Sequence, residues 1–312
     1  MNQIERCNPE LTAVSIFAYN RPAHLEQILK FFENGNLPAK YCFHIFVDSA
    51  ENFSPSNDYV KYLAINFSKI CEYSNLEIRT SNFGLSRSIV FGLNRVFQLH
   101  NRSVILEDDI VPTVEFMRIC DTGLINFQHH NEISTITGWN YANNLGNFNS
   151  DFILAKRHSS WGWATWSNRW FSIDWNLKYR NLSLKQKIKV FFASPDLLSF
   201  MKLNEKGEID SWATLLNINF ILQGTRSLVP RVRLVENIGQ DGSGTHSVSE
   251  SKESKTHAER SQNIPTLKIG TTASKSSYYD AVICLKHSIL NNSFRTILYL
   301  FLSRFNLINR KR

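Results

Sequence analysis

The sequence predicts an α/β fold in which helices flank a mostly parallel β-sheet. Patterns of buried strands alternate with helical patterns over residues 11–110, which is typical of parallel strands joined by crossover helices. Of the 312 residues, 43% are hydrophobic, enough for a sizeable core. A disordered chain, a collagen-like chain and a small disulfide-stabilised scaffold are therefore excluded.

Four strands and three helices are expected in this first part of the chain. The first helix lies between Pro22, which suits a first helical turn, and Gly35, which ends it. A later helix begins at Leu85 and repeats apolar residues on one face. The remaining elements are a helix at 57–72 and strands at 11–18, 41–47, 76–79 and 103–106.

The second part is less regular. Apolar spacing predicts helices and strands in turn, at 116–127, 133–137, 211–222 and 228–235. The composition then shifts to Gly, Ser, Lys, Glu and Thr, so residues 246–275 are expected to be a flexible linker. Residues 276–312 follow as a basic, amphipathic tail, a C-terminal helical extension of the fold.

The net charge of +8 is concentrated in the tail. Between residues 275 and 312, seven Lys and Arg side chains stand against Asp280 alone, so the rest of the chain is close to neutral. Nucleic-acid binding is not expected, because phosphate backbones require a broad basic face. An apolar and basic tail instead predicts contact with an anionic membrane surface, the inner leaflet. The alternative is a final helix packed on the same chain or on a partner subunit.

The polar start of the chain and the spacing of its cysteines predict a cytoplasmic location. No apolar core of a signal peptide follows Met1. The longest apolar run of the tail, 297–302, is far shorter than the roughly 20 residues that span a bilayer. The five cysteines are widely spaced without a C-x-x-C pair, which argues against a zinc knuckle or a disulfide framework. We expect a cytoplasmic protein, peripheral on the inner membrane face.

Three adjacent carboxylates, Glu107, Asp108 and Asp109, follow the strand at 103–106. Ligands of open α/β sheets bind outside the carboxyl ends of the strands. Neighbouring carboxylates repel one another, and a divalent cation would neutralise them. Oxygen ligands of this type suit Mg²⁺ or Mn²⁺. The alternative is an acidic turn in which Asp109 caps the next helix.

Other candidate residues are expected at the same rim. Arg21 follows the first strand and suits a phosphate, and Asp48 follows the second and suits a ribose or a base edge. The alternatives are structural: Asn20 would cap the next helix, and Asp48 would cap a turn with Ser49. Arg87, in the first turn of the helix from residue 85, adds a positive charge where a helix start favours anions.

Two residues in the second part are candidates for chemistry. Asp210 either caps the helix after it or acts as a general base for an acceptor hydroxyl, with Glu208 as the weaker candidate. His246 ends a Gly-rich stretch and could be a further metal or phosphate ligand. The motifs of dinucleotide oxidoreductases, P-loop NTPases and α/β-hydrolases are missing from the sequence, which argues against these classes.

Taken together, these residues resemble nucleotide-sugar glycosyltransferases of the GT-A fold, over roughly residues 11–246. The similarity is to the N-acetylglucosaminyltransferase I-like group and to bacterial sugar transferases of surface-polysaccharide synthesis. The segments that carry it are Ala18–Pro22, Asp48, Arg87–Phe97, Val104–Asp109, Gly138–Asn140, Trp161–Trp163, Asp210–Trp212 and Asn237–His246.

The resemblance implies a GT-A (Rossmann-like) domain over residues 1–245, with a nucleotide-sugar half at about 11–110 and an acceptor half at about 111–245. Asp109 would hold Mn²⁺ or Mg²⁺, with His246 as a further ligand, and Asp210 would be the catalytic base. One departure is Ser88, which stands where the family has a histidine that contacts the base. The donor would contact Tyr19, Asn20, Arg21, Asp48, Arg87, Glu107 and Asp108.

The resulting hypothesis is a metal-dependent, inverting hexosyltransferase. It would move a sugar from a UDP-sugar to a hydroxyl of a lipid-linked glycan acceptor in surface-polysaccharide synthesis. The alternatives are a catalytically silent glycan-binding or scaffold protein of an envelope assembly, and a sugar-phosphate nucleotidyltransferase. The latter usually carries a Gly-rich loop after the first strand, where this chain has Tyr19, Asn20 and Arg21.

Overall fold

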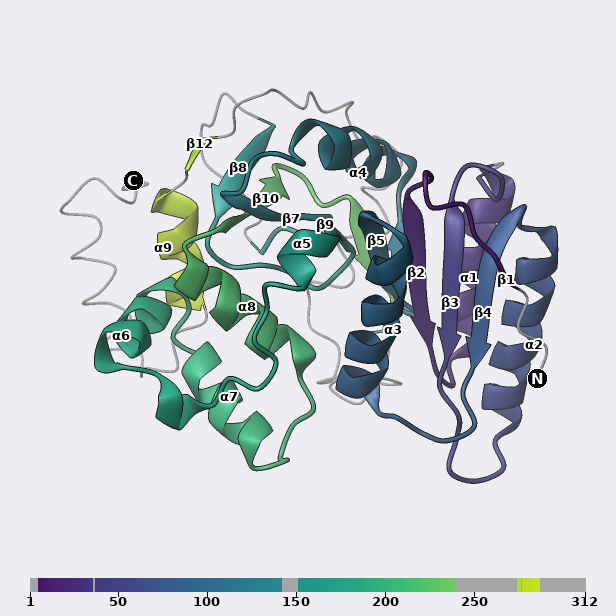
Figure 1. Cartoon of the computed structure of the whole chain (residues 1–312), viewed down its shortest axis with the longest axis horizontal. Helices are drawn as coiled ribbons and strands as arrows, with labels where there is room; N and C mark the ends of the chain where they lie inside the picture. The colour runs from purple at the N-terminus through teal and green to yellow at the C-terminus, as the bar shows by residue number, and fades with distance from the viewer. Residues whose placement is uncertain (1–4, 36, 142–150, 240–273, 276, 287–312) are drawn as a thin grey trace, which may run out of the picture.

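A ten-stranded sheet runs through the molecule, and helices cover both of its faces (Figure 1). The computed structural model describes residues 5–35, 37–141, 151–239, 274–275 and 277–286. The linker residues 246–273 and the tail residues 287–312, for which the sequence makes predictions, lie outside the described residues.

Five of the nine pairs of neighbouring strands in the sheet are parallel. In order across the sheet, its strands are β1 (Glu5–Arg6), β4 (Tyr73–Ile78), β3 (Cys42–Val47), β2 (Ala13–Ala18), β5 (Arg102–Glu107), β9 (Trp163–Trp166), β7 (Ile133–Thr137), β10 (Arg226–Pro230), β8 (Phe152–Ala155) and β12 (Ser274–Lys275). Strands β4, β3, β2 and β5 run parallel, as do β7 and β10. Strand β9 is antiparallel to both of its neighbours. The predicted fold class is confirmed.

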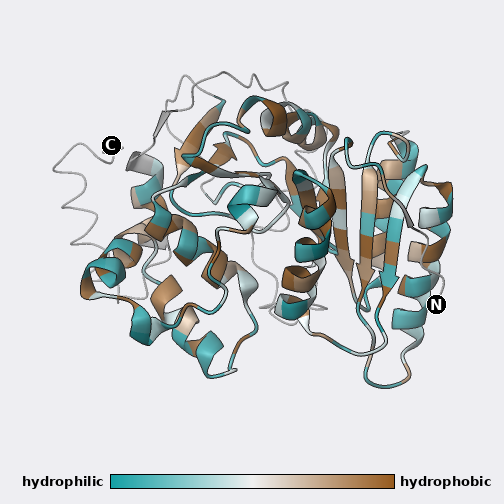
Figure 2. Cartoon of the chain, in the orientation of Figure 1, coloured by the Kyte–Doolittle hydropathy of each residue, from teal (hydrophilic) through white to brown (hydrophobic). Residues whose placement is uncertain are grey.

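Helices bury both faces of this sheet. One face is covered by α1 (Pro22–Asn34), α2 (Pro55–Ile70) and α4 (Val114–Asn126), and the other by α3 (Leu85–Leu99), α5 (Ser167–Trp170) and α8 (Trp212–Gln223). Along β2, Val14 and Ile16 pack on the α1 face, whereas Ala13 and Phe17 pack on the α3 face. Figure 2 shows hydrophobic residues concentrated in the strands and in the helix faces toward them. Burial on both faces explains why the strands are continuous apolar runs in the sequence.

Helices of the second part form smaller cores at the other end of the molecule. A short turn of 3₁₀ helix (Tyr179–Asn181) leads to α6 (Leu184–Ala193) and α7 (Leu197–Glu205), which pack on α8. Helix α9 (Ser277–Lys286) packs against β8 through Tyr279 and Ile283. Asp280 of α9 accepts a hydrogen bond from the Lys156 N–H at 2.8 Å. The described part of the tail therefore packs on the body of the molecule.

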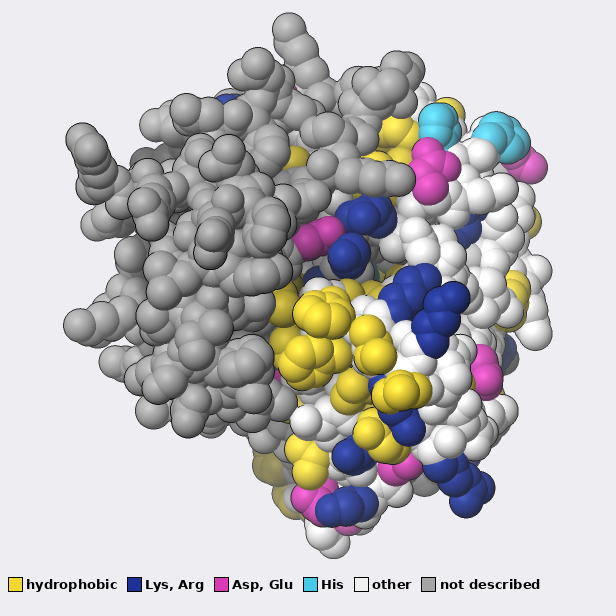
Figure 3. Space-filling model, turned by 90° about the vertical axis from the view of Figure 1, so that its left-hand side faces the viewer, with side chains coloured by type: hydrophobic (Ala, Val, Ile, Leu, Met, Phe, Trp, Pro, Cys, Tyr) yellow, Lys and Arg dark blue, Asp and Glu magenta, His cyan; other side chains and the backbone are white. Residues whose placement is uncertain are grey.

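The end of the molecule that carries α6 has exposed hydrophobic side chains. Leu184, Ile188 and Phe192 lie along α6 at helical spacing, and they are 74%, 48% and 62% exposed. Figure 3 views this end and shows hydrophobic side chains gathered beside Lys and Arg. Of the helices that the structure describes, none is long and hydrophobic enough to cross a bilayer.

Several element boundaries differ from the predictions. Helix α2 begins at Pro55, before the predicted residue 57, because the Ser54 hydroxyl accepts a hydrogen bond from the Asn57 N–H at 3.3 Å. Strand β4 begins at Tyr73, before the predicted residue 76. The segment 228–235 contributes to two strands that lie in different sheets, because Pro230 ends β10. Strand β11 (Val235–Asn237) then pairs with β6 (Ile110–Pro112) in a separate antiparallel ribbon.

Candidate functional site

The loops that follow the parallel strands β2, β3, β4 and β5 meet at one edge of the sheet. They carry Arg21, Asp48, Arg79 and the acidic triplet, which is Glu107, Asp108 and Asp109. We call this the carboxyl edge. Of these residues, Arg21, Asp48 and the acidic triplet are the ones that the sequence singles out.

Arg21 forms ion pairs with two carboxylates of the acidic triplet. Its Nη1 lies 2.9 Å from Asp109 Oδ2, and its Nη2 contacts Asp108 Oδ1. Asp108 also accepts a hydrogen bond from the Tyr19 N–H at 3.2 Å. The side chain of Asp108 is 4% exposed and that of Asp109 is 16% exposed, so Asp109 is the more open carboxylate.

The ribbon of β6 and β11 positions Asp109. The Ile238 N–H, directly after β11, donates to the Asp109 carbonyl at 2.9 Å. His24 on α1 contacts the Ile238 carbonyl through Nε2 at 3.1 Å. A Cβ atom on Gly239 would collide with Asp109 Oδ2 and would lie 2.8 Å from Arg21 Nη1. A glycine is therefore needed where the backbone passes this ion pair.

Burial changes the ionisation of the two inner carboxyls. Burial, with the charges of Asp109 and Asp108 beside it, raises the pKa of Glu107 to about 8. Burial also raises the pKa of Asp108 to about 6, although the Arg21 guanidinium opposes this shift. Among the described residues, none forms a hydrogen bond with the Glu107 carboxyl. Arg21 alone therefore leaves part of the negative charge of the triplet uncompensated.

These residues fit a divalent cation that takes few ligands from the protein. Asp109 offers a partly exposed carboxylate, and the uncompensated charge beside it favours a cation. The three carboxylates do not converge on one point as a complete set of metal ligands. In the described part of the chain, one group of three or more ligand atoms does converge, and it lies elsewhere. Magnesium-type ions are commonly held by one or two carboxylates together with substrate phosphates and water.

Asp48 holds the loop before α3 against the end of β3. Its two oxygens accept hydrogen bonds from the Phe83 N–H at 2.9 and 3.0 Å. The turn with Ser49 also forms, since the Ser49 N–H donates to Asp48 Oδ1 at 3.0 Å. The Asn57 amide donates to the carbonyls of Tyr19 and Asp48, at 2.6 and 2.8 Å, and joins the loops after β2 and β3.

Asp210 lies at the N-terminus of α3. Its Oδ2 accepts a hydrogen bond from the Ser86 N–H at 3.1 Å. The alternative in which Asp210 caps the helix after it is wrong, because the N-cap of α8 is Ser211. Gly84, with φ of 74°, leaves room for the carboxylate, since a Cβ atom there would lie 3.3 Å from Asp210 Oδ2. The negative charge that the N-terminus of α3 favours is therefore supplied by the Asp210 side chain.

A series of contacts connects this helix start with the acidic triplet. The Gly84 N–H donates to Asn82 Oδ1 at 2.8 Å, and Asn82 Nδ2 donates to the Tyr19 hydroxyl at 3.4 Å. The Tyr19 N–H in turn donates to Asp108. The base candidate Asp210 and the metal-ligand candidate Asp109 therefore belong to the same edge of the sheet.

The other predicted residues have simpler surroundings. Asn20 is exposed, and the expectation that it caps α1 is wrong, because Arg21 occupies the N-cap position. Arg87 is exposed, and its guanidinium lies 4.2 Å from the centre of the Phe83 ring. His246 lies outside the described residues.

Arg79 also belongs to the carboxyl edge, and it was not among the residues predicted from the sequence. It follows β4, its side chain is 1% exposed, and its guanidinium lies 4.2 Å from the centre of the Phe83 ring. Its Nη2 donates to the Ser88 carbonyl at 3.2 Å, whereas Nε and Nη1 have no hydrogen-bond partner among the described residues. A charged residue directly after a parallel strand was the available signal.

No family model and no curated protein matches the chain. Several solved structures are similar to it. The mannosyltransferase PcManGT from Pyrobaculum calidifontis, in complex with GDP-Man and Mn²⁺, is 10% identical with a TM-score of 0.41, over 96% of this chain and 72% of that one. The galactosyltransferase LgtC, in complex with donor and acceptor sugar analogs, is 10% identical with a TM-score of 0.39, over 91% and 99%.

A putative glucose-1-phosphate thymidylyltransferase from Bacillus anthracis is also similar. It is 8% identical with a TM-score of 0.37, over 83% of this chain and 97% of that one. Sugar transferases and a nucleotidyltransferase thus occur together among the similar structures.

Proposed function

We propose that this protein is a metal-dependent glycosyltransferase of the GT-A type. The proposed donor is a UDP-sugar, the cofactor is Mn²⁺ or Mg²⁺, and the anomeric carbon inverts. The main support is that Arg21 pairs with Asp109 at the carboxyl edge and that Asp210 lies at the start of α3 on the same edge. Open α/β sheets bind their ligands at such an edge.

The donor diphosphate would lie beside Asp109 and Arg21. A cation held by Asp109 would supply charge stabilisation for the leaving diphosphate. Because Arg21 lies 2.9 Å from Asp109, its guanidinium would reach a phosphate at the same place. The residues that would contact the ribose, the base or the sugar of the donor are Tyr19, Asn20, Asp48, Arg87, Glu107 and Asp108.

Asp210 would act as the general base. The Ser86 N–H holds its Oδ2, which leaves Oδ1 for the proton of the acceptor hydroxyl. The hydroxyl oxygen forms a bond to the anomeric carbon as the bond to the diphosphate oxygen breaks. The sugar carries positive charge in the transition state. No leaving-group acid is required, because the diphosphate leaves as an anion.

The proposed acceptor is a lipid-linked glycan on the inner face of the cytoplasmic membrane. Support comes from the sequence of the tail, in which seven of the basic residues lie between 275 and 312. The exposed Leu184, Ile188 and Phe192 of α6 add an apolar surface at the end of the molecule where α9 lies. Nucleic acid is not a proposed partner.

Calorimetric titration of the full chain with UDP, with and without Mn²⁺, tests this proposal. We expect binding that requires the ion. In the Asp109→Asn variant the affinity should fall about 10- to 100-fold, since one charged contact contributes roughly 1.5–3 kcal/mol. Asp121→Asn is the matched control, because Asp121 also pairs with a cation, Lys40 at 2.6 Å, but lies on α4.

Two outcomes would contradict the proposal. A wild-type chain that binds no UDP in the presence of Mn²⁺ would favour the silent glycan-binding or scaffold protein. Formation of a nucleotide-sugar from a sugar 1-phosphate and a nucleoside triphosphate would favour the nucleotidyltransferase. Screening UDP-sugars for metal-dependent hydrolysis then identifies the donor sugar.

A further inference from the structure

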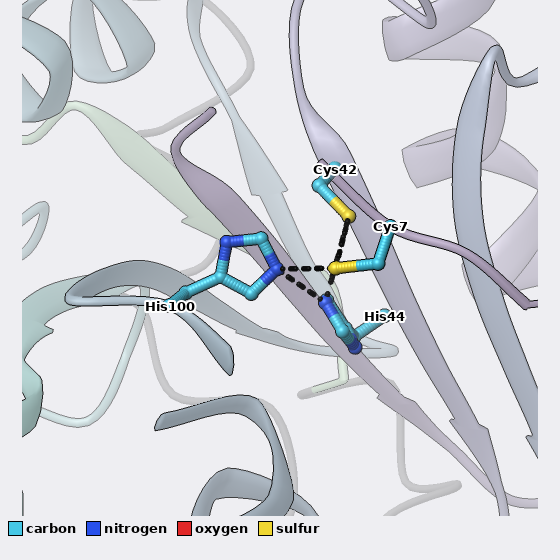
Figure 4. A group of neighbouring side chains, drawn as sticks. All are labelled: Cys7, Cys42, His44 and His100. Atoms are coloured by element: carbon cyan, nitrogen blue, oxygen red, sulfur yellow. Dashed lines mark hydrogen bonds between the residues drawn. The ribbon is translucent and has the colours of Figure 1, made fainter. Parts of the chain in front are cut away.

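A second group of chemically active side chains lies at the opposite edge of the sheet, where the parallel strands begin. Figure 4 shows Cys7, Cys42, His44 and His100 pointing toward one another. One ligand atom from each of them, a sulfur or a ring nitrogen, lies within 4.8 Å of the other three. Cys42 is the first residue of β3, and His100 is the C-cap of α3. We call this group the Cys–His cluster.

The ligand atoms of the Cys–His cluster lie within 4.8 Å of one another, and two of their distances, both 3.6 Å, match those of a zinc site. Cys7 Sγ lies 3.6 Å from Cys42 Sγ and 3.0 Å from His100 Nε2. His44 Nε2 lies 2.9 Å from His100 Nε2 and 3.6 Å from Cys42 Sγ. In a tetrahedral zinc site, bonds of about 2.3 Å to sulfur and about 2.0–2.1 Å to nitrogen place the ligand atoms about 3.3–3.8 Å apart. A disulfide would bring the sulfurs to about 2.05 Å.

Hydrogen bonds within the cluster leave one short contact of His100 unexplained. His100 Nδ1 donates to the Leu11 carbonyl at 3.2 Å, so Nε2 of the neutral ring carries a lone pair and no proton. This single lone pair faces both Cys7 Sγ and His44 Nε2, which cannot both donate along its axis. A histidine that binds a metal usually donates its other ring N–H to a carbonyl or carboxylate, as His100 does here.

The surroundings suit a soft-ligand cation. Cys42, His44 and His100 are each at most 1% exposed. Two sulfurs and two imidazole nitrogens in a tetrahedron are the ligand set of zinc, whereas Mg²⁺ and Mn²⁺ prefer oxygen. A pocket of about 150 Å³ lies beside His44 and is also lined by Arg95 and Leu99, among others.

We propose that Cys7, Cys42, His44 and His100 bind one Zn²⁺ ion as a structural site. The two thiols would release their protons to solvent and bind as thiolates, and the imidazoles would bind as neutral rings. The ion would fasten the segment before β2 to the start of β3 and to the end of α3. Four protein ligands leave no open position for substrate, so the ion stabilises the fold. This proposal is independent of the proposed transferase activity.

Metal analysis of the purified full chain tests the proposal. Elemental analysis by inductively coupled plasma mass spectrometry should find about one zinc ion per chain. After chelation under reducing conditions, Co²⁺ should restore a site with the strong visible absorption of tetrahedral cobalt and a thiolate charge-transfer band. Cys42→Ser and Cys7→Ser should lose both signals. The matched control Cys71→Ser, a buried cysteine outside the cluster, should keep them.

The proposal is overturned if the reduced wild-type chain retains no zinc and gives no tetrahedral cobalt spectrum. It is also overturned if Cys7→Ser and His44→Gln bind as much zinc as the wild type, because the ion would then lie elsewhere. A Cys7–Cys42 disulfide in the protein as purified, detected by thiol counting, would be a third contrary result. Should Cys42→Ser fail to fold, the half-buried Cys7 supplies the decisive variant.

Discussion

Backbone N–H groups hold the aspartates of the carboxyl edge. Phe83 donates to Asp48, Tyr19 donates to Asp108, and Ser86 donates to Asp210. Each bond fixes the direction of one carboxylate oxygen and leaves further lone pairs for a ligand. These side chains therefore have fixed directions, which is what the proposed binding and catalytic roles require.

Asp210→Asn separates the chemical role of Asp210 from its structural one. The amide oxygen of Asn still accepts the Ser86 N–H, so α3 keeps its cap, but the side chain no longer takes a proton. We expect transfer to fall by about 10²- to 10⁴-fold, the usual contribution of a general base. The measurements are initial rates of sugar transfer and the midpoint of thermal unfolding.

Glu208→Gln is the control for this variant, since Glu208 is the other carboxylate in the same segment. It should retain near-normal transfer. The assignment of the base fails if Asp210→Asn remains active, or if Glu208→Gln shows the larger loss.

At the scale of elements, a buried ion pair joins β8 to the helices α6 and α7. Arg157 Nη1 lies 2.7 Å from Asp196 Oδ1, and the two side chains are 9% and 7% exposed. Ser194, the C-cap of α6, also donates to Asp196 at 2.7 Å. Asp196 thus connects the adjoining ends of α6 and α7 to the segment after β8, since its partner Arg157 lies 39 residues earlier in the chain.

Asp196→Ala should destabilise the protein strongly. The substitution leaves the Arg157 guanidinium buried without its carboxylate, and such a loss costs about 3–5 kcal/mol. Urea unfolding, followed by circular dichroism, measures the change in the free energy of unfolding. The contrasting variant is Glu26→Ala, which removes an exposed pair with Lys30 on α1 and should leave the midpoint almost unchanged. Equal effects of the two variants would show that burial of the pair does not matter.

At the scale of the whole molecule, the two edges of the sheet have different chemistry. The carboxyl edge gathers Asp48, Asp109 and Asp210, and the opposite edge gathers the Cys–His cluster. Oxygen ligands at one edge and sulfur and nitrogen ligands at the other select different ions. Removal of the proposed zinc ion with a zinc-selective chelator should therefore lower stability without abolishing the proposed Mn²⁺-dependent binding of nucleotide.

A truncation that tests the membrane proposal must leave α9 in the chain, because α9 packs on the body of the molecule. Tyr279 and Ile283 are buried against β8, so a cut before α9 would expose the core. A chain of residues 1–286 retains this helix and lacks most of the basic residues of the tail. We expect the full chain to sediment with anionic vesicles and the 1–286 chain to remain in solution, with equal unfolding midpoints.

Vesicles of neutral lipid are the control for this experiment, because electrostatic attraction requires anionic headgroups. If both chains bind anionic vesicles equally, the tail is not the membrane contact. The exposed face of α6, with Leu184 and Ile188 among lysines, would then be the surface to alter.

Much of the element order could be predicted from the sequence, because apolar periodicity is a local signal. The helix between Pro22 and Gly35 is α1, and the strand at 103–106 lies within β5. Boundaries were less predictable where a side chain or a proline decides them, as at Ser54 and Pro230. The acidic triplet was recognisable because residues directly after a parallel strand must lie at its carboxyl edge.

What the sequence alone determined is which residues follow each strand, since that depends only on neighbours along the chain. Only the tertiary structure decided that Arg21 pairs with Asp109, that Asp210 caps α3, and that Cys7 meets His100. These partners are 88, 124 and 93 residues apart. Such contacts depend on the order of the strands in the sheet, which local periodicity does not encode.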